Sequence, residues 1–254
     1  MRYKIVLSYD GTSFSGWQIQ PNAPSVQECL QAALSTLMGE EISVTGAGRT
    51  DAGVHAIRYA AHFDSFSGRL GANVLVCKLN AILPVSVRVH EVSEVPDDFH
   101  ARFDAVSRSY MYLIDRGRNP FAVPWSWQCG YKLDMDAMNV AARCLLGTHD
   151  FSCFEKTGGN NKTSVCTVTE ASWSVCDPFE SGLPFLHGSD LLVFRVSADR
   201  FLRNMVRAIV GTLVEVGRGR RTPDSIPALL DSHDRCCAGE SVPARGLFLT
   251  DVEY

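Results

Sequence analysis

The chain has 254 residues, of which 46% are apolar and 20% are charged. This composition supports a sizeable core and excludes an intrinsically disordered chain. No apolar run approaches the roughly 18–20 residues of a membrane span. The opening segment, MRYKIVLSYDG, is too often interrupted by polar residues to be the core of a signal peptide. We therefore expect a soluble, unexported, cytoplasmic protein.

The formal net charge is −4, but positive and negative residues are concentrated in separate segments near the end of the sequence. Residues 195–221 contain seven arginines and two acids, a balance of +5, whereas residues 222–254 contain six acids and two arginines, a balance of −4. A positive face can therefore form on an acidic protein, which leaves a polyanionic partner open. The chain has 19 arginines and 5 lysines, a ratio that suits phosphate binding but that genomic composition bias also produces.

The nine cysteines are scattered, and none belongs to a C-x-x-C pair or a cysteine–histidine knuckle. The sequence also lacks an H-E-x-x-H motif. We expect most of the cysteines to be small buried residues in a reducing compartment. We expect no metal site.

In the first half of the chain, the spacing of apolar residues predicts the order β-α-β-β-α-β. A helical spacing runs from Val26 to Met38, where Ser25 and Glu28 form a capping box and Gly39 is a natural stop. The expected strands are 3–9, 42–45, 55–63 and 85–95, and the second expected helix is 72–83.

The second half of the chain repeats this order. Its expected strands are 107–114, 162–175, 191–198 and 247–252, its helices are 134–146 and 201–216, and a short extra helix covers 224–230. Segments 115–130 and 155–161 are interpreted as insertions.

The sequence thus predicts an α/β (α+β) fold of two fused ferredoxin-like halves, residues 1–105 and 106–254. They are expected to form one mixed, mainly antiparallel sheet with helices on one face and a central concave cleft on the other.

The most informative stretch is the glycine-rich loop GAGRTDAGVHA, residues 46–56. Glycines at 46, 48 and 53 are expected to give positive φ angles and close approach to a ligand. A dinucleotide fingerprint would need glycine in place of Asp51, and a P-loop would need Gly-Lys-Ser/Thr, so both motifs fail. A carboxylate on such a loop can reach a substrate, and a tight turn with an Asp–Arg surface pair is an equally good interpretation. Gly53 argues against a helix that would bring Asp51 and His55 together on a metal.

The string GRTDAGVHA resembles the catalytic motif of the tRNA pseudouridine synthase A (TruA) family. Further stretches resemble the family in the expected order from end to end, which a chance match to one motif would not do. These stretches are YDGTSFSGWQIQ, SVQ, LNAILP, DDFHARFDA, SYMYLI, FLRNMVRAIVGTLVEVG and ARGLFLTDVEY.

The resemblance implies an isomerase that converts uridine to pseudouridine at positions 38, 39 and 40 of the tRNA anticodon stem-loop, without a cofactor. It implies that Asp51 is the catalytic nucleophile or base, that Arg207 pairs with Asp51, and that Tyr110 stacks on the target uracil. Arg49 would fill the vacancy left by the flipped base. Without the family, Tyr110 and Tyr112 also fit as core aromatics.

The family is expected to work as a homodimer, with one tRNA lying across both subunits. Phosphate contacts are expected from an arginine cluster, with His100 and Arg102 as secondary candidates. The cluster is Arg200, Arg203, Arg218, Arg220 and Arg221. On a helical wheel Arg207 lies opposite the apolar side of its helix, so a solvated helix face is the alternative interpretation.

One departure from the family lies close to the catalytic motif. Many relatives have glutamine where this chain has Tyr59, which changes the contacts expected beneath the loop, whereas the Asp, Tyr and Arg set is complete. Two rival hypotheses remain at this point. One is a catalytically silent tRNA-binding or chaperone protein, and the other is an aspartate-nucleophile hydrolase of small molecules, which would leave the arginine cluster without a role.

Overall fold

A computed structural model describes residues 1–67, 70–156, 158, 162–175 and 190–254. These residues form five α-helices and ten β-strands, most of them in antiparallel pairs, so the predicted α+β class is confirmed. The chain divides into two compact units. Unit 1 contains Met1–Val106 and Phe248–Tyr254, and unit 2 contains Ser107–Leu247. No helix in the described part of the chain is long and apolar enough to cross a membrane.

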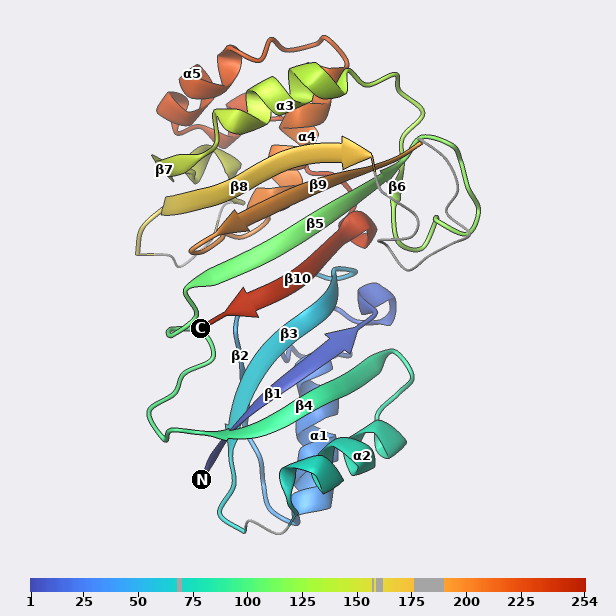
Figure 1. The fold of residues 1–254 in the computed structure, drawn as a ribbon, viewed down its shortest axis with the longest axis vertical. Helices are drawn as coiled ribbons and strands as arrows, with labels where there is room; N and C mark the ends of the chain where they lie inside the picture. Colours follow the sequence, from blue (N-terminus) through green and yellow to red (C-terminus); the bar gives the residue numbers. More distant parts are fainter. Residues whose placement is uncertain (68–69, 157, 159–161, 176–189) are drawn as a thin grey trace. The chain divides into compact units, whose positions relative to one another are not determined.

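Unit 1 has the predicted β-α-β-β-α-β order (Figure 1). Its elements are β1 (Arg2–Tyr9), α1 (Val26–Met38), β2 (Val44–Gly46), β3 (His55–Asp64), α2 (Ala72–Ile82) and β4 (Val87–Val95). The strands run in the order β4-β1-β3 with antiparallel pairing, and β2 pairs with the second half of β3. Strand β10 (Leu247–Glu253) is parallel to the start of β3, where Phe248 lies opposite His55.

Local signals in the sequence explain the helix and strand faces of unit 1. Helix α1 begins where the Ser25 side chain accepts a hydrogen bond from the Glu28 amide, and it ends at Gly39 with a φ of 71°. Both signals were predicted. Alternate residues of β1, from Tyr3 to Tyr9, are at most 4% exposed, which makes them the sheet's contribution to the core.

Unit 2 contains an antiparallel sheet in the order β5-β9-β8-β7, with the short β6 parallel to β5 (Figure 1). Its elements are β5 (Ser107–Asp115), β6 (Trp127–Gln128), α3 (Met135–Arg143), β7 (Gly147–Asp150), β8 (Val165–Val175), β9 (Leu191–Ala198), α4 (Met205–Gly217) and α5 (Ser225–Ser232). The sequence predicted neither β6 nor β7. The expected second half also included the last strand, whose residues from Phe248 onward belong to unit 1 because they pair with β3.

Some element boundaries differ from the prediction for local reasons. The helix expected at 201–216 begins at Met205, because Asn204 takes a left-handed φ of 64° that a helix cannot include. The helix expected at 134–146 spans only Met135–Arg143, and Asp134 caps it by accepting from the Ala137 amide. The expected insertion at 155–161 lies largely outside the described residues.

The cysteines correct one expectation. Of the eight described, three are buried, two are half-buried, and three (Cys77, Cys236 and Cys237) are exposed, so the prediction that most are buried is wrong. The exposed ones lie on α2 and on a short turn at Arg235–Cys237, where one side of the chain faces solvent. Cys176 lies outside the described residues.

Candidate active site

The loop from Gly46 to Val54 joins β2 to β3 in unit 1 and presents Asp51 half-buried and Arg49 exposed. Its backbone is fixed by the opening segment of the chain. The Trp17 amide donates to the Thr50 carbonyl at 3.3 Å, and the Gly53 amide donates to the Phe14 carbonyl at 3.4 Å. The Asp51 carbonyl accepts from the Val54 amide at 3.1 Å. The carboxylate of Asp51 is therefore carried by an ordered backbone.

Of the three loop glycines, Gly53 alone has the positive φ that the sequence predicted. Gly53 has a φ of 77°, and a Cβ added to Gly46 would lie 2.1 Å from the Tyr59 hydroxyl oxygen. The φ angles of Gly46 and Gly48 are not positive, and a Cβ on Gly48 would meet nothing within 4 Å. A glycine outside the motif is more constrained, because a Cβ on Gly16 would lie 2.3 Å from the Thr50 carbonyl at a φ of 97°.

Three aromatic side chains lie beneath the loop. Tyr59 is 1% exposed, Trp17 is 3% exposed, and their rings stack with centroids 4.0 Å apart. The Tyr59 hydroxyl donates to the Gly48 carbonyl, and the Tyr9 and Thr50 hydroxyls are 2.9 Å apart. Trp17 is therefore a core residue that supports the loop. Sequence reasoning missed Tyr9, although its place next to the DGTSFSGW segment was a usable signal.

His55 follows the loop and has a structural environment. It is 2% exposed, its Nδ1 accepts from the Gly11 amide at 3.1 Å, and its ring stacks on Phe248 at 4.6 Å. In the described part of the chain, no group of three His, Cys, Asp or Glu residues is placed to hold a metal ion.

In unit 2, the two tyrosines of β5 have different environments. Tyr112 is fully buried and donates to the Pro243 carbonyl at 2.8 Å, so it is a core residue. Burial raises the pKa of the Tyr112 phenol, and the charges of Arg207 and Arg245 oppose that shift. Tyr110 is half-buried, and its ring meets Phe201 edge-on with centroids 5.0 Å apart. Tyr110 is thus partly accessible to a ligand, whereas Tyr112 is not.

Arg207 lies in the first turn of α4 and is held by the segment Gly239–Pro243. Its Nε donates to the Val242 carbonyl at 2.7 Å, while the Val242 amide donates to the Arg207 carbonyl at 3.3 Å. Arg207 is half-buried, so the alternative of a solvated helix face does not describe it. Sequence reasoning missed Val242, because the acceptor is a backbone carbonyl and any side chain can precede it.

The segment that holds Arg207 packs directly on the helix backbone. The Gly239 amide donates to the buried Thr212 hydroxyl at 2.9 Å. A Cβ on Gly211 would lie 1.8 Å from the Glu240 carbonyl oxygen, so the two backbones meet at a distance that only glycine permits. Asn204 fixes the other side of the segment, since its Nδ2 donates to the Ser241 hydroxyl at 2.5 Å.

The arginine cluster separates into engaged and exposed members. Arg221 pairs with Glu215 at 3.2 Å and donates to the Cys237 carbonyl, and Arg218 lies 3.5 Å over the Tyr131 ring. Arg203 and Arg220 are exposed, and Arg200 is half-buried. The exposed arginines are therefore the better placed for phosphate contacts.

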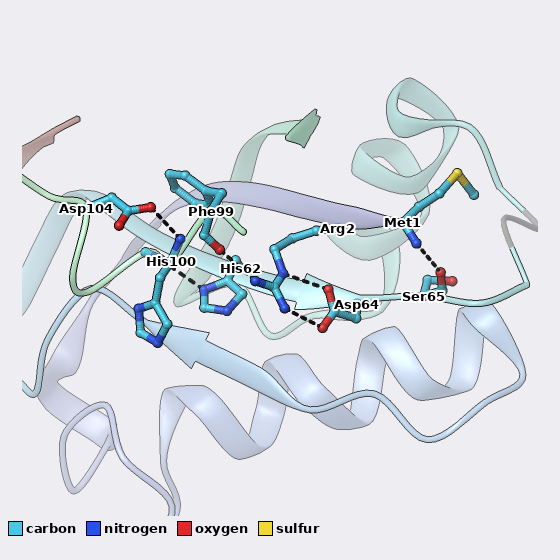
Figure 2. A network of polar contacts seen from close by, with 9 residues as sticks. Met1, Arg2, His62, Asp64, Ser65, Phe99, His100 and Asp104 are labelled. Atoms are coloured by element: carbon cyan, nitrogen blue, oxygen red, sulfur yellow. Dashed lines mark hydrogen bonds and ion pairs between the residues drawn. The ribbon is translucent and has the colours of Figure 1, made fainter. Parts of the chain in front are cut away.

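His100, a secondary candidate, organises its own loop in unit 1 (Figure 2). Its amide donates to the Asp104 carboxylate at 2.7 Å. Its Nδ1 accepts from the Arg102 amide at 3.1 Å. The neighbouring His62 is 6% exposed, and its Nδ1 accepts from the Ala101 amide at 3.1 Å. Arg102 itself is exposed.

His62 predicts how the stability of the protein depends on pH. Burial, and then the charge of His100, lowers the pKa of His62 to about 4 from 6.5. In the unfolded chain His62 therefore binds a proton below about pH 6.5, whereas in the folded protein it binds one only below about pH 4. The free energy of unfolding should fall as pH decreases across that interval, by about 3 kcal/mol for this group.

Urea unfolding of wild type and His62→Gln at several pH values between 7 and 4 measures this contribution. We expect the wild type to lose more stability than the variant on acidification, because both share every other titrating group. If the free energy of unfolding falls equally with pH in the two proteins, His62 does not cause the loss of stability.

Comparisons with known proteins place the chain among RNA-modifying enzymes. A family model described as tRNA pseudouridine synthase matches residues 5–104 and 141–254. Asp51 and Arg207 lie within the matched segments, and Tyr110 lies between them.

Curated relatives match over nearly the whole chain. The tRNA pseudouridine synthase A of Bacteroides thetaiotaomicron is 46% identical over 254 residues, which cover 100% of this chain and 90% of that protein. The protein of the same name from Bacteroides fragilis is 45% identical, with coverage of 100% and 96%. That of Acetivibrio thermocellus is 42% identical, with coverage of 99% and 98%.

Proposed function

Because this chain belongs to the tRNA pseudouridine synthase family, and is therefore an isomerase that converts uridine to pseudouridine in tRNA, we propose that it acts at nucleotides 38, 39 and 40 of the anticodon stem-loop with Asp51 as the catalytic residue. The reaction breaks the bond from C1′ to N1 of uracil and forms a bond from C1′ to C5. The proton on C5 is lost, and N1 gains a proton, so atoms and charge balance without a co-reactant.

The chemistry suits a carboxylate on an ordered loop. An ionised Asp51 either attacks C1′, which gives a covalent intermediate, or removes the C2′ proton, which gives a glycal. The observation that carries the proposal is the half-buried Asp51 on a loop whose backbone is hydrogen-bonded on both sides of it, at Thr50 and Gly53. Preorganisation of this kind keeps a reacting group in position without a cost during the reaction.

Tyr110, Arg207 and Arg49 are proposed to act on the same nucleotide. Tyr110 would stack on the extruded uracil and assist loss of the C5 proton, which its half-buried ring supports. Arg207 would keep the catalytic carboxylate ionised, a role supported by a guanidinium whose Nε is already fixed on Val242. Exposed Arg49 would fill the space that the flipped base leaves.

We propose that the tRNA body is bound by phosphate contacts from exposed arginines, chiefly Arg203 and Arg220, with contributions from Arg200 and Arg218. Arg221 is already paired with Glu215, which makes it a weaker candidate. The working form would be a homodimer in the cytoplasm, with one tRNA lying across both subunits.

Tritium release tests the positional assignment directly. Transcripts carrying 5-[³H]uridine would be made with uridine at 38, 39 and 40, and matched transcripts would have cytidine at those three positions and uridine elsewhere. We expect release only from the first set, since C5 loses its hydrogen only when it becomes the glycosidic carbon. Equal release from both sets would place the target outside positions 38–40. Binding of both sets without release would favour the silent tRNA-binding protein.

A further inference from the structure

The Tyr59 side chain links β3, the strand that follows the Asp51 loop, to the loop itself. It lies on β3, is 1% exposed, and its hydroxyl donates to the Gly48 carbonyl, while the Gly48 amide lies 3.4 Å from the same oxygen. We infer that Tyr59 is a positioning residue for the reaction, which holds the Gly46–Thr50 arm of the loop so that Asp51 has a single placement. The inference rests on the proposed role of Asp51.

The phenol has no room to take another position. Its ring stacks on Trp17 with centroids 4.0 Å apart and lies 5.7 Å from the Tyr9 ring. A Cβ on Gly46 would lie 2.1 Å from the Tyr59 oxygen and 2.5 Å from Trp17 Nε1, so the loop backbone closes directly over both side chains. The hydroxyl is therefore preorganised, and its hydrogen bond needs no side-chain ordering when the loop engages substrate.

At Gly48 itself, the contact with the Tyr59 hydroxyl takes the place of side-chain packing. An added Cβ at Gly48 would meet nothing within 4 Å, so packing does not fix the residue. The next anchor along the chain is Thr50, whose carbonyl accepts from the Trp17 amide and whose hydroxyl contacts Tyr9. Before Gly48, the buried Ala47 donates its amide to the Ala60 carbonyl at 2.9 Å. The arm that leads to Asp51 is thus held at Ala47, Gly48 and Thr50, and Tyr59 supplies the middle one of these contacts.

Loss of the hydroxyl should affect the chemical step more than binding. Tyr59→Phe leaves the ring stack intact and removes the donor to Gly48, which frees the arm three residues before Asp51. A small displacement of a reacting group costs up to about 10²-fold in rate. We expect the single-turnover rate of pseudouridine formation to fall about 10-fold or more, with the tRNA dissociation constant within about 2-fold of wild type.

Tyr3→Phe is the matched control. Tyr3 lies on the same face of the unit 1 sheet, is 4% exposed and stacks on Phe63, and its hydroxyl contacts the Met1 sulfur, far along the sheet from the loop. Both substitutions delete one phenolic oxygen from the same core. We expect the control to keep the wild-type single-turnover rate. An equal loss of rate in Tyr3→Phe and Tyr59→Phe would show that general destabilisation of the core, and not the contact with Gly48, lowers the rate.

A rescue and a measurement without activity complete the test. 4-Aminophenylalanine at position 59 restores an N–H donor on the same ring, and it should recover most of the rate lost in Tyr59→Phe. Amide hydrogen exchange should increase in peptides covering 46–54 in Tyr59→Phe and stay unchanged in peptides covering 87–95. Unchanged exchange and an unchanged rate in Tyr59→Phe would overturn the inference, as would a rate that the amine fails to restore.

Asp51→Asn, run in parallel, separates this inference from the function on which it rests. If Asp51→Asn is inactive and Tyr59→Phe keeps the wild-type rate, only the positioning role fails. If Asp51→Asn is active, the proposed role of the carboxylate fails, whatever Tyr59→Phe does.

Discussion

Replacement of Asp51 by Asn is expected to lower the single-turnover rate of pseudouridine formation by about 10³-fold or more, because a neutral amide neither attacks C1′ nor removes a proton. The loop should survive the change. The substitution leaves the backbone hydrogen bonds of the loop in place, including the Asp51 carbonyl that accepts from the Val54 amide. The melting temperature of the variant should therefore stay close to that of the wild type.

Tritium release and filter binding on the same tRNA preparation separate chemistry from affinity. The tRNA dissociation constant of Asp51→Asn should stay within a few-fold of wild type and, if anything, decrease, since one negative charge is removed near a polyanion. Asp231→Asn, at an exposed position on α5, controls for the change in net charge and should release tritium normally. Release by Asp51→Asn at more than a tenth of the wild-type rate would assign the carboxylate's role to another group.

The second large effect is expected from Gly211→Ala in α4. In an open helix this substitution would stabilise the protein by up to about 1 kcal/mol. Here the new Cβ would lie 1.8 Å from the Glu240 carbonyl oxygen, which is backbone and has no rotamer by which to move aside. We expect the free energy of unfolding to fall by about 2–4 kcal/mol. The segment displaced is the one that supplies the Val242 acceptor to Arg207, so the rate should fall as well.

Denaturant unfolding of wild type, Gly211→Ala and Gly130→Ala measures this cost. Gly130 is exposed and lacks a positive φ, and a Cβ there would make only an ordinary contact at 3.8 Å, so its alanine variant should match wild type within about 0.5 kcal/mol. Stability of Gly211→Ala at or above the wild-type value would mean that segment Gly239–Pro243 moves away from the helix without a penalty.

Local patterns in the sequence predicted the elements of the fold well. Ser25 and Gly39 delimited α1 correctly, since capping involves residues only a few positions apart. The start of α4 was misplaced because the left-handed conformation of Asn204 goes with its contact to Ser241, which lies 37 residues away. Short strands such as β6 and β7 have too few residues to show a period.

In the candidate site, too, the features set by neighbouring residues could be predicted and those set by distant contacts could not. The glycine-rich motif drew attention to Asp51 directly, whereas the groups that hold the loop and Arg207 are a phenol, a hydroxyl and a backbone carbonyl from distant segments. Tyr59 was visible only as a departure from its relatives, and the direction of its effect required its contact with Gly48. A pattern in one sequence does not show which carbonyl meets which donor across a fold.

The pairing of β10 with β3 has a consequence for synthesis on the ribosome. Phe248 stacks on His55 just after the Asp51 loop, and Arg58 reaches Asp251 across a separation of 193 residues. Translation must therefore produce all of unit 2 before the start of β3 gains this neighbour, so unit 1 is completed last although its strands are made first. Until then the edge of β3 is open to other strands in the nascent chain. The competence of the Asp51 loop is thus linked in time to the arrival of the final strand.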